Sequence, residues 1–466
     1  MTVTGFFKSE IKIYKMDGFF RSDGQCFPTV AVVGSGISGL SAAWMLSKSC
    51  AVTLYEKDAR LGGHSNTVQV EGRSGPIGVD TGFIVFNEAN YPNLTALFDH
   101  LDITTKPTRM SFSVSGGGEF EYAGSVGGLL AQPANILSIR VWRMLAEIRR
   151  FYRDAPAILN STISDFLSLG EYLEQEHYSD DFINHHILPM GAAIWSTPLR
   201  EMTRYPATSF IKFYVNHGLF KFTNRPLWRT VVGGSEKYIS ALAQSLNGAI
   251  KKGCGVGSIR RSRGRAILTD YSGAVHDYDH VVIATHADDA LELLEDPSKN
   301  EIQHLKKFQY SENQAVLHSD DTLMPNQRRA WSSWNFIRSA PEDERTSVTY
   351  WMNRLQGMTG ETPLFVTLNP VHEPKPASVI ASFEYKHPIF DADALQAQQT
   401  LWNLQGHRHT WFCGSYFGSG FHEDGLQSGL AVGEALGGTR RPWSVLEESG
   451  RIYMGSGSYR IGEESL

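Results

Sequence analysis

An uninterrupted run of small and β-branched apolar residues from Thr29 to Val33 predicts a short, fully buried strand. A helix is predicted directly after it over Ile37–Ser47, and a second apolar run from Ala51 to Tyr55 predicts the next strand. This order of strand, helix and strand is typical of the parallel α/β units that build open, doubly wound sheets.

A different pattern covers residues 300–400, where apolar and polar positions alternate, as in Ala315–His318 and Leu364–Leu368. That period predicts a half-buried antiparallel sheet. Helices are predicted over Tyr91–Leu101 and Leu137–Tyr152. Four aromatic residues of the predicted sheet either wall an apolar cavity or belong to the core, and the sequence leaves both open: Trp331, Trp334, Tyr350 and Trp351.

Composition narrows the class of protein. The 466 residues are enough for two interwoven domains with substantial cores. Acidic and basic residues are mixed along the chain at a net charge of −6, so no nucleic-acid footprint is present. The four cysteines lack metal-ligand spacing, so we predict no metal site and a reducing compartment.

No apolar stretch reaches the roughly 18–20 residues that span a bilayer. Residues 1–28 lack the apolar core of a secretory signal, and we expect them to be an N-terminal extension. The expected location is the cytoplasm.

A glycine-rich turn, Gly34-Ser-Gly36-Ile-Ser-Gly39, joins the first predicted strand to the first helix. Gly34 allows the tight turn, Gly36 lets a pyrophosphate approach the backbone, and Gly39 lets the helix pack on the strand. Glu56 lies 22 positions after Gly34, where a carboxylate accepts both hydroxyls of an adenosine ribose. The pattern predicts a site for the ADP half of a dinucleotide, formed by Gly34, Ser35, Gly36, Ile37, Ser38, Gly39, Glu56 and Lys57.

The next segment carries a more specific signal, because Arg60-Leu-Gly62-Gly63-His64-Ser-Asn-Thr67 resembles the Arg-x-Gly-Gly-x-x-x-Thr signature of FAD-dependent amine oxidases, carotenoid desaturases and protoporphyrinogen oxidases. A glycine pair admits a second close backbone approach to phosphate or ribityl oxygens, and an arginine adds a charge-assisted donor. The resemblance implies that the dinucleotide is FAD, with Arg60, Gly62, Gly63 and His64 among its contacts.

Two further segments resemble parts of the same superfamily. Residues 279–287 resemble the strand and Ala284-Thr285 turn that return beneath the nucleotide, and the preceding hairpin Cys254–Tyr278 would place Val256 near the adenine. Residues 410–430 resemble the closing flavin motif, whose helix points its N-terminus at the isoalloxazine. The resemblance adds Gly414, Asp424, Gly425 and Leu426 to the cofactor contacts. The cysteine that tethers FAD in some amine oxidases precedes this motif, whereas Cys413 lies in the strand entering it, so we predict non-covalent FAD.

The combined pattern over residues 29–438 is most similar to a flavoprotein family of predicted NAD/FAD-binding proteins within the amine oxidase superfamily, some members of which are linked to modified fatty acids. The resemblance implies an α/β fold in which a Rossmann-type FAD-binding domain is interwoven with an α+β substrate domain. The expected segments are an extension (1–28), FAD-binding parts (29–72, 232–290 and 408–438), substrate-domain parts (73–231 and 291–407) and a C-terminal tail (439–466).

Flavin chemistry requires few side chains, so the catalytic candidates are those beside the closing motif: Tyr416, His422 and Glu423. The strand 310–318 has no lysine near Asn313 or Gln314, unlike the better-known amine oxidases, which disfavours an amine substrate and oxygen as acceptor. The predicted function is hydride abstraction from a hydrophobic, lipid-derived or fatty-acyl small molecule, leading to desaturation. The electron acceptor is left open.

Two alternative functions and one question about a helix remain open. One alternative function is an amine oxidase that produces hydrogen peroxide, and another is a non-catalytic binding protein on the same fold. The question concerns the basic helix at 138–153, which either docks on a membrane surface or is a solvated helix that packs Trp142, Leu145, Ile148 and Tyr152 inward.

Overall fold

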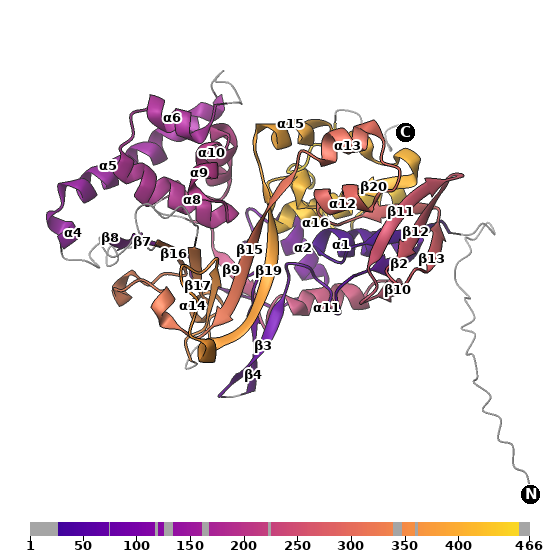
Figure 1. The fold of residues 1–466 in the computed structure, drawn as a ribbon, viewed down its shortest axis with the longest axis horizontal. Helices are drawn as coiled ribbons and strands as arrows, with labels where there is room; N and C mark the ends of the chain where they lie inside the picture. Colours follow the sequence, from indigo (N-terminus) through magenta and orange to yellow (C-terminus); the bar gives the residue numbers. More distant parts are fainter. Residues whose placement is uncertain are drawn as a thin grey trace, which may run out of the picture.

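The computed structural model describes residues 27–73, 75–116, 120–124, 134–160, 167–221, 225–338, 347–358 and 362–455. Most of the N-terminal extension and the end of the C-terminal tail lie outside these ranges. Figure 1 shows two lobes side by side, with a parallel sheet in one lobe, a helical group and a mixed sheet in the other, and two long strands passing between them.

A five-stranded parallel sheet forms the centre of the first lobe, in the order β10-β2-β1-β14-β20. Its strands come from three distant parts of the chain: β1 (Thr29–Val33), β2 (Ala51–Tyr55), β10 (Gly248–Lys251), β14 (His280–Ile283) and β20 (Thr410–Phe412). The β-branched residues of β1 are fully or almost fully buried from Val30 onward. The interwoven α/β fold is therefore confirmed.

Two helices cross closely on this sheet, α1 (Ile37–Leu46) and α16 (His422–Gly437). Glycines allow the close approach, since a Cβ on Gly429 would come within 2.2 Å of the Ser38 carbonyl oxygen. The segment predicted as a hairpin is instead a three-stranded antiparallel meander, because a second turn follows at 271–274. Its strands are β11 (Val256–Ser262), β12 (Arg265–Asp270) and β13 (Val275–Tyr278).

The second lobe contains a seven-stranded sheet in the order β19-β15-β18-β17-β16-β7-β8. Its strands are β7 (Phe112–Gly116), β8 (Phe120–Ala123), β15 (Gln309–His318), β16 (Trp334–Arg338), β17 (Ser347–Trp351), β18 (Phe365–Leu368) and β19 (Val379–Ile389). The alternation over 300–400 predicted its antiparallel part correctly. The sequence analysis missed β7 and β8, which join the sheet through a parallel pairing of β7 with β16.

A helical group completes the second lobe: α4 (Ala134–Leu137), α5 (Ile139–Asp154), α6 (Leu169–Gln175), α7 (Asp180–Phe182), α8 (Leu188–Trp195), α9 (Leu199–Thr203) and α10 (Ala207–Asn216). The inward face of α5 differs from the prediction at Trp142, whose exposed fraction is 56%, because Val141, Met144 and Phe151 occupy the buried face. Ile148 and Tyr152 are buried as expected.

The remaining strands and α-helices lie around these sheets and helices: β3 (Thr67–Gly72), β4 (Gly75–Asp80), β5 (Phe86–Asn87), β6 (Thr105–Pro107), β9 (Trp228–Val231), α2 (Pro92–His100), α11 (Glu236–Gln244), α12 (Ala287–Leu293), α13 (Lys299–Leu305), α14 (Met352–Leu355) and α15 (Ala392–Leu401). Figure 1 shows α13 and α15 beside α12 on the first lobe, although their residues fall in the expected second part of the substrate domain. Within the described ranges, no helix has the length and apolarity needed to cross a membrane.

Candidate active site

One large cavity, of about 1300 Å³, lies between the two lobes. It exceeds the roughly 300–1,000 Å³ of common small-molecule pockets, so it has room for a cofactor together with a substrate. The first lobe lines one part, here called the nucleotide end, with residues 33–38, 55–58, 60, 62–64, 255–257 and 284–286. The second lobe lines the other part, here called the substrate end, with residues from 108–112, 190–228, 334, 350 and 368.

The glycine-rich turn between β1 and α1 forms the floor of the nucleotide end. Gly34 has a φ of +101°, and a Cβ there would lie 2.9 Å from the Ala284 carbonyl oxygen. Gly39 has no space for any side chain, since its Cβ would meet the Gly34 carbonyl oxygen. Gly36 is different, because its φ of −61° is ordinary and an added Cβ would come within 4 Å of no atom in the described part of the chain. The missing side chain at Gly36 therefore leaves open space in front of the α1 N-terminus.

Glu56 lies at the end of β2 with its carboxylate against this turn. One oxygen accepts hydrogen bonds from the Ser35 amide (2.9 Å) and the Ser35 hydroxyl (2.5 Å), and the other accepts one from the Asp58 amide (2.9 Å). These bonds hold the acid at the edge of the cavity. A carboxylate at this place suits a ribose diol and disfavours a 2′-phosphate.

The glycine pair lies beside the first glycine turn. Gly62 and Gly63 both have positive φ values, and a Cβ on Gly63 would lie 3.2 Å from the Gly36 Cα atom. Arg60 donates a hydrogen bond to the Gly63 carbonyl oxygen at 2.8 Å, which fixes the second turn. Two strips of bare backbone thus face the same space, as a bound diphosphate requires.

The other residues predicted to contact the nucleotide differ in whether they line the cavity. The cavity wall includes Ser35, Ile37, Ser38, Lys57, His64, Val256, Ala284, Thr285 and Gly414. The Ala284 amide donates to the Val33 carbonyl oxygen at 2.8 Å, which brings the β14 turn against Gly34. Gly425 packs on α1, where its Cβ would lie 2.9 Å from Ser38 Oγ, and Leu426 is fully buried in the core. Gly425 and Leu426 do not line the cavity, so their contribution to a cofactor is the position of the helix.

The N-terminus of α16 points to the middle of the cavity, where Phe421 and His422 form part of the wall. Asp424 caps this end, since its carboxylate accepts hydrogen bonds from the Ser419 amide (3.0 Å) and the Phe421 amide (2.7 Å). The Asp424 carboxylate also pairs with Arg451 Nε at 2.6 Å. The acid therefore holds the helix end in place and does not itself line the cavity.

Glu423 has a different place from the one expected for an acid–base group. Its carboxylate is fully buried and accepts hydrogen bonds from the Asn93 and Leu94 amides at 3.0 Å each. These are the first amides of α2, so Glu423 ties the N-terminus of α2 to α16. Because the carboxylate is turned away from the cavity, the structure does not support its prediction as a catalytic group.

The other two catalytic candidates line the cavity. Tyr416 is buried, and its hydroxyl has no hydrogen-bond partner among the described residues. His422 stacks on Phe83 with 3.9 Å between ring centroids, and its Nε2 shares a hydrogen bond of 2.5 Å with the Tyr238 hydroxyl. Burial lowers the pKa of His422 to about 3, so its imidazole is neutral.

Sequence reasoning missed Tyr238 and Ser65, which together support His422. The Tyr238 hydroxyl also pairs with Ser65 Oγ, so a buried chain of three polar groups leads from the cavity wall into the first lobe. Tyr238 lies in α11, an ordinary amphipathic helix, and no local signal separates it from a core tyrosine.

The substrate end is mainly apolar. Of the four aromatic residues left open, Trp334 and Tyr350 line it, whereas Trp331 and Trp351 pack edge to face against each other outside it. Its other large apolar residues are Met110, Phe112, Met190, Ile194, Trp195, Phe213, Leu219, Leu227, Trp228 and Leu368. Among the described residues that line this end, Arg225 is charged and no aspartate or glutamate is present.

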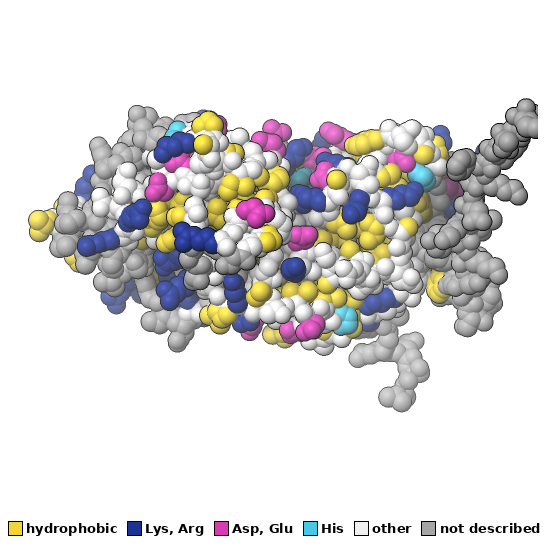
Figure 2. Space-filling view, turned by 90° about the horizontal axis from the view of Figure 1, so that it is seen from below, with side chains coloured by type: hydrophobic (Ala, Val, Ile, Leu, Met, Phe, Trp, Pro, Cys, Tyr) yellow, Lys and Arg dark blue, Asp and Glu magenta, His cyan; other side chains and the backbone are white. Residues whose placement is uncertain are grey.

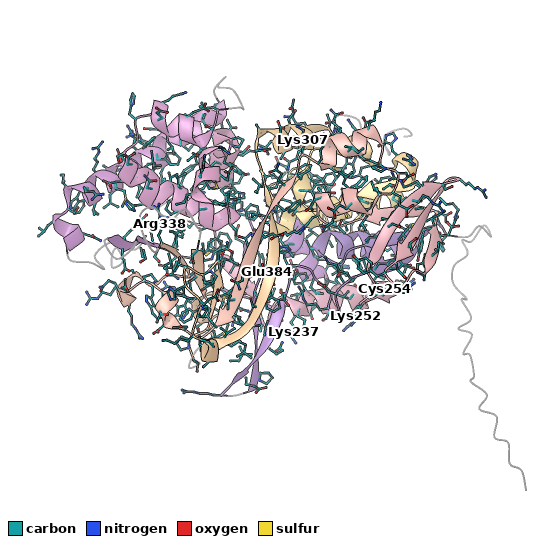
Figure 3. The ribbon with its side chains drawn as sticks, viewed as in Figure 1. Lys237, Lys252, Cys254, Lys307, Arg338 and Glu384 are labelled. Atoms are coloured by element: carbon teal, nitrogen blue, oxygen red, sulfur yellow. The ribbon has the colours of Figure 1, made fainter. Side chains whose placement is uncertain are left out.

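Strands β15 and β19 pass the middle of the cavity and contribute Glu312, Glu384 and Lys386 to its wall; Figure 3 shows Glu384 between the lobes. Lys386 Nζ lies 3.4 Å from Asp288 Oδ2, so the lysine is paired with α12. Asn313, on β15, is buried, and its amide donates to the Ser311 carbonyl oxygen. No lysine of β15 contributes to the cavity in the described part of the chain.

Comparison with known proteins gives a family for this architecture. The family described as "Flavin containing amine oxidoreductase" matches residues 37–316, which is more than half of the chain. A search of curated protein sequences finds no match.

Solved structures with a similar fold include proteins with different named activities. The chain aligns with a putative protoporphyrinogen oxidase from Exiguobacterium sp. 255-15 with a TM-score of 0.63 and 15% identity, over 88% of this chain and 98% of that one. A CLA-producing fatty acid isomerase from P. acnes gives a TM-score of 0.62 and 14% identity over the same shares. A putrescine oxidase gives a TM-score of 0.64 and 14% identity, over 88% of this chain and 98% of that one. At these identities the similarity shows the fold.

Proposed function

Because the chain belongs to the family of flavin-containing amine oxidoreductases, and is therefore a FAD-dependent oxidoreductase, we propose that it removes a hydride from a hydrophobic, lipid-derived substrate such as a fatty acyl chain. The observation that carries this proposal is the substrate end itself. Its described wall is formed by aromatic and aliphatic side chains, with Arg225 as its charged group. Such a wall stabilises an alkyl chain by burial and offers no counter-ion to a cation.

The nucleotide end fits FAD. Gly36 and Gly63 leave bare backbone for the diphosphate, the α1 N-terminus favours its charge, and Glu56 suits the adenosine ribose. Bound there, FAD supplies an acceptor for the hydride of the substrate.

We propose that this binding is non-covalent. None of the described cysteines, Cys50, Cys254 and Cys413, lines the cavity. Burial also raises the pKa of the Cys413 thiol well above its usual range, which keeps it protonated and unreactive. Cys254 lies at the entry to β11, on the first lobe (Figure 3).

The chain itself supplies position, charge stabilisation and a dry environment. The first amides of α16 have no intrahelical acceptors, so they stabilise negative charge that develops at the centre of the cavity. Tyr238 and Phe83 hold His422 at the same place, where its imidazole is unprotonated and so available to accept a proton that leaves the substrate, although burial makes it a weak base. Aromatic residues of the substrate end exclude water from this point.

An amine oxidase is the alternative that the fold alone leaves open, since a putrescine oxidase and a fatty acid isomerase match it almost equally. Two features support the lipid over the amine. The described substrate end has no carboxylate, since Glu312 and Glu384 line the middle of the cavity from β15 and β19, and β15 contributes no lysine to the cavity. The alternative of a non-catalytic binding protein is set aside because the family is one of enzymes.

The proposal is tested by anaerobic reduction of the purified holoenzyme with a panel of long-chain fatty acids, their thioesters and aliphatic amines. We expect the flavin absorbance to bleach with an acyl substrate and an additional double bond to be found in the product by mass spectrometry. Bleaching by amines alone would overturn the lipid proposal and establish the amine oxidase.

The outer face of the helical lobe supports peripheral membrane contact as a further part of this proposal. Leu137, Ile139 and Trp142 are exposed by 90%, 80% and 56%, and Arg140 and Arg143 lie between and beside them. Figure 2 shows basic side chains gathered at this end of the molecule. Apolar anchors among arginines suit an anionic lipid surface.

Sedimentation with phosphatidylglycerol vesicles tests this contact. We expect the protein to bind, and Trp142→Glu to weaken binding while Leu446→Glu, at an exposed position in the C-terminal segment, leaves it unchanged. Equal loss in both variants, or no binding by the wild type, would contradict the proposed surface.

A further inference from the structure

Three histidines from separate elements meet on the wall of the nucleotide end. His64 follows the glycine pair, His286 lies at the N-cap of α12, and His387 belongs to β19. The ring centroid of His64 lies 6.0 Å from that of His286 and 5.4 Å from that of His387. We call these three residues the histidine cluster. Of the three, His64 alone was predicted from the sequence to contact the cofactor.

The histidine cluster is anchored to both glycine turns. His64 directly follows Gly63, which lies against Gly36, and His286 follows the Ala284–Thr285 turn, which lies against Gly34. Tyr385 stacks on His64 at 5.0 Å and fixes its ring plane. The imidazoles therefore flank the space that two bare backbone strips and the α1 N-terminus reserve for a diphosphate.

Each imidazole of the histidine cluster has one buried nitrogen without a hydrogen-bond partner among the described residues: His64 Nε2, His286 Nδ1 and His387 Nδ1. Burial lowers the pKa of His64 and His286 to about 4 and that of His387 to about 3. The cluster is therefore neutral in the ligand-free protein. Buried polar atoms without partners are uncommon in folded proteins and call for an explanation.

Charged groups from the neighbouring elements face the cluster. Arg60 faces His64 and opposes its protonation. Around His286 lie Lys57 and Lys386, which oppose protonation, and the carboxylates of Asp288 and Asp289, of which Asp289 Oδ2 is 3.8 Å from His286 Nδ1. Protonation within the cluster is mutually opposed, because His286 lowers the pKa of His64 and His64 lowers the pKa of His387. Among the described residues, no carboxylate contributes to the pKa of His64 or His387, so a bound anion would change the protonation of these two histidines most.

We propose that the histidine cluster takes up protons when FAD binds and donates hydrogen bonds to its diphosphate. The inference rests on the FAD site described above and concerns how this chain recognises the cofactor. Negative charge beside a desolvated imidazole favours its protonated form, which has two donors instead of one. Because the bound state then holds more protons than the free state, the affinity for FAD rises as the pH falls.

Calorimetric titration of the apoprotein with FAD, at several pH values from about 6 to about 8, tests this linkage in the range where histidines titrate. Titrations in two buffers of different ionisation enthalpy count the protons taken up. For each proton taken up on binding, we expect the Kd for FAD to fall by up to about tenfold when the pH is lowered by one unit. Neither the diphosphate nor the isoalloxazine changes charge in this range, so an uptake belongs to the protein. An affinity independent of pH, with no proton uptake, would overturn the proposal.

Two variants, His64→Gln and His387→Gln, locate the effect. Each is expected to reduce the proton uptake and flatten the pH dependence while the bound flavin keeps its visible spectrum. The control His407→Gln changes an exposed histidine outside the cavity and should behave like the wild type. A full pH dependence in both cluster variants would overturn the assignment to these residues. Failure of the wild type to bind FAD at any pH would instead overturn the cofactor site on which the inference rests.

Discussion

The two ends of the cavity are lined by different parts of the chain, one by backbone and the other by side chains. At the nucleotide end the walls are largely backbone, with glycines at positions where any Cβ would either clash or fill the space. At the substrate end they are side chains from three separate regions of the sequence, which contribute β7, the pair α8 and α10, and the pair β16 and β17. A wall of backbone restricts residue type at fixed spacing, whereas a wall of side chains can be built from many apolar combinations. A site formed by backbone can therefore be predicted from the sequence, whereas a site formed by apolar side chains cannot.

The largest expected effect is the loss of FAD binding when the nucleotide end alone is changed. Gly36→Val places a side chain in open space at an ordinary φ, so the protein should fold while FAD is excluded. We expect binding to weaken by about 1,000-fold or more, roughly 4 kcal/mol. Fluorescence titration of FAD and thermal unfolding of the apoprotein measure the two properties.

The matched control for this variant is Gly124→Val, which does not line the cavity and where an added Cβ also meets no atom of the described residues. Unchanged FAD affinity in Gly36→Val would show that the bare backbone at this turn does not face the cofactor.

A change at the junction of the two ends comes next. His422→Gln removes a proton acceptor but keeps a polar side chain beside Tyr238. The rate of anaerobic flavin reduction by the substrate should fall by about 100-fold, the usual loss for a general base. FAD affinity should stay within a few-fold, because the nucleotide end is untouched. Stopped-flow absorbance gives the rate, and a rate equal to that of the wild type would exclude His422 as the base.

Ile194→Asn changes the substrate end alone. It puts an amide into an apolar wall, where an unmatched polar group costs about 1–3 kcal/mol. We expect KM for a long-chain substrate to rise by about tenfold, with FAD affinity unchanged. Ile302→Asn, on α13 outside the cavity, serves as the control. A loss of FAD in Ile194→Asn would contradict the separation of the two ends.

The smallest expected effect concerns Arg225, the charged residue of the described substrate end. Arg225→Ala should raise KM for a free fatty acid by about threefold, since an exposed ion pair contributes at most about 1 kcal/mol. KM for an uncharged ester should not change. Steady-state kinetics with both substrates distinguish an acid contact from a general loss of packing, which would affect the two equally.

The same contrast decides what could be predicted. The first strand, α1 and both glycine turns were predictable because Gly34, Gly39 and Gly63 lie where a Cβ would press on nearby backbone, and Gly36 leaves open space for a ligand at a fixed spacing from them. Glu423 was misjudged because its partners are the amides of α2, more than three hundred residues away in the chain. Tyr238 and His387 were missed for the same reason, since their roles exist only where α11 and β19 meet other elements.

The most direct measurement is a crystal structure of the protein with FAD and a long-chain fatty acid. The account predicts the diphosphate between Gly36 and Gly63, the isoalloxazine at the N-terminus of α16, and the alkyl chain against Met190, Ile194 and Trp195. An alkyl chain bound outside the substrate end, or a flavin ring away from α16, would contradict it.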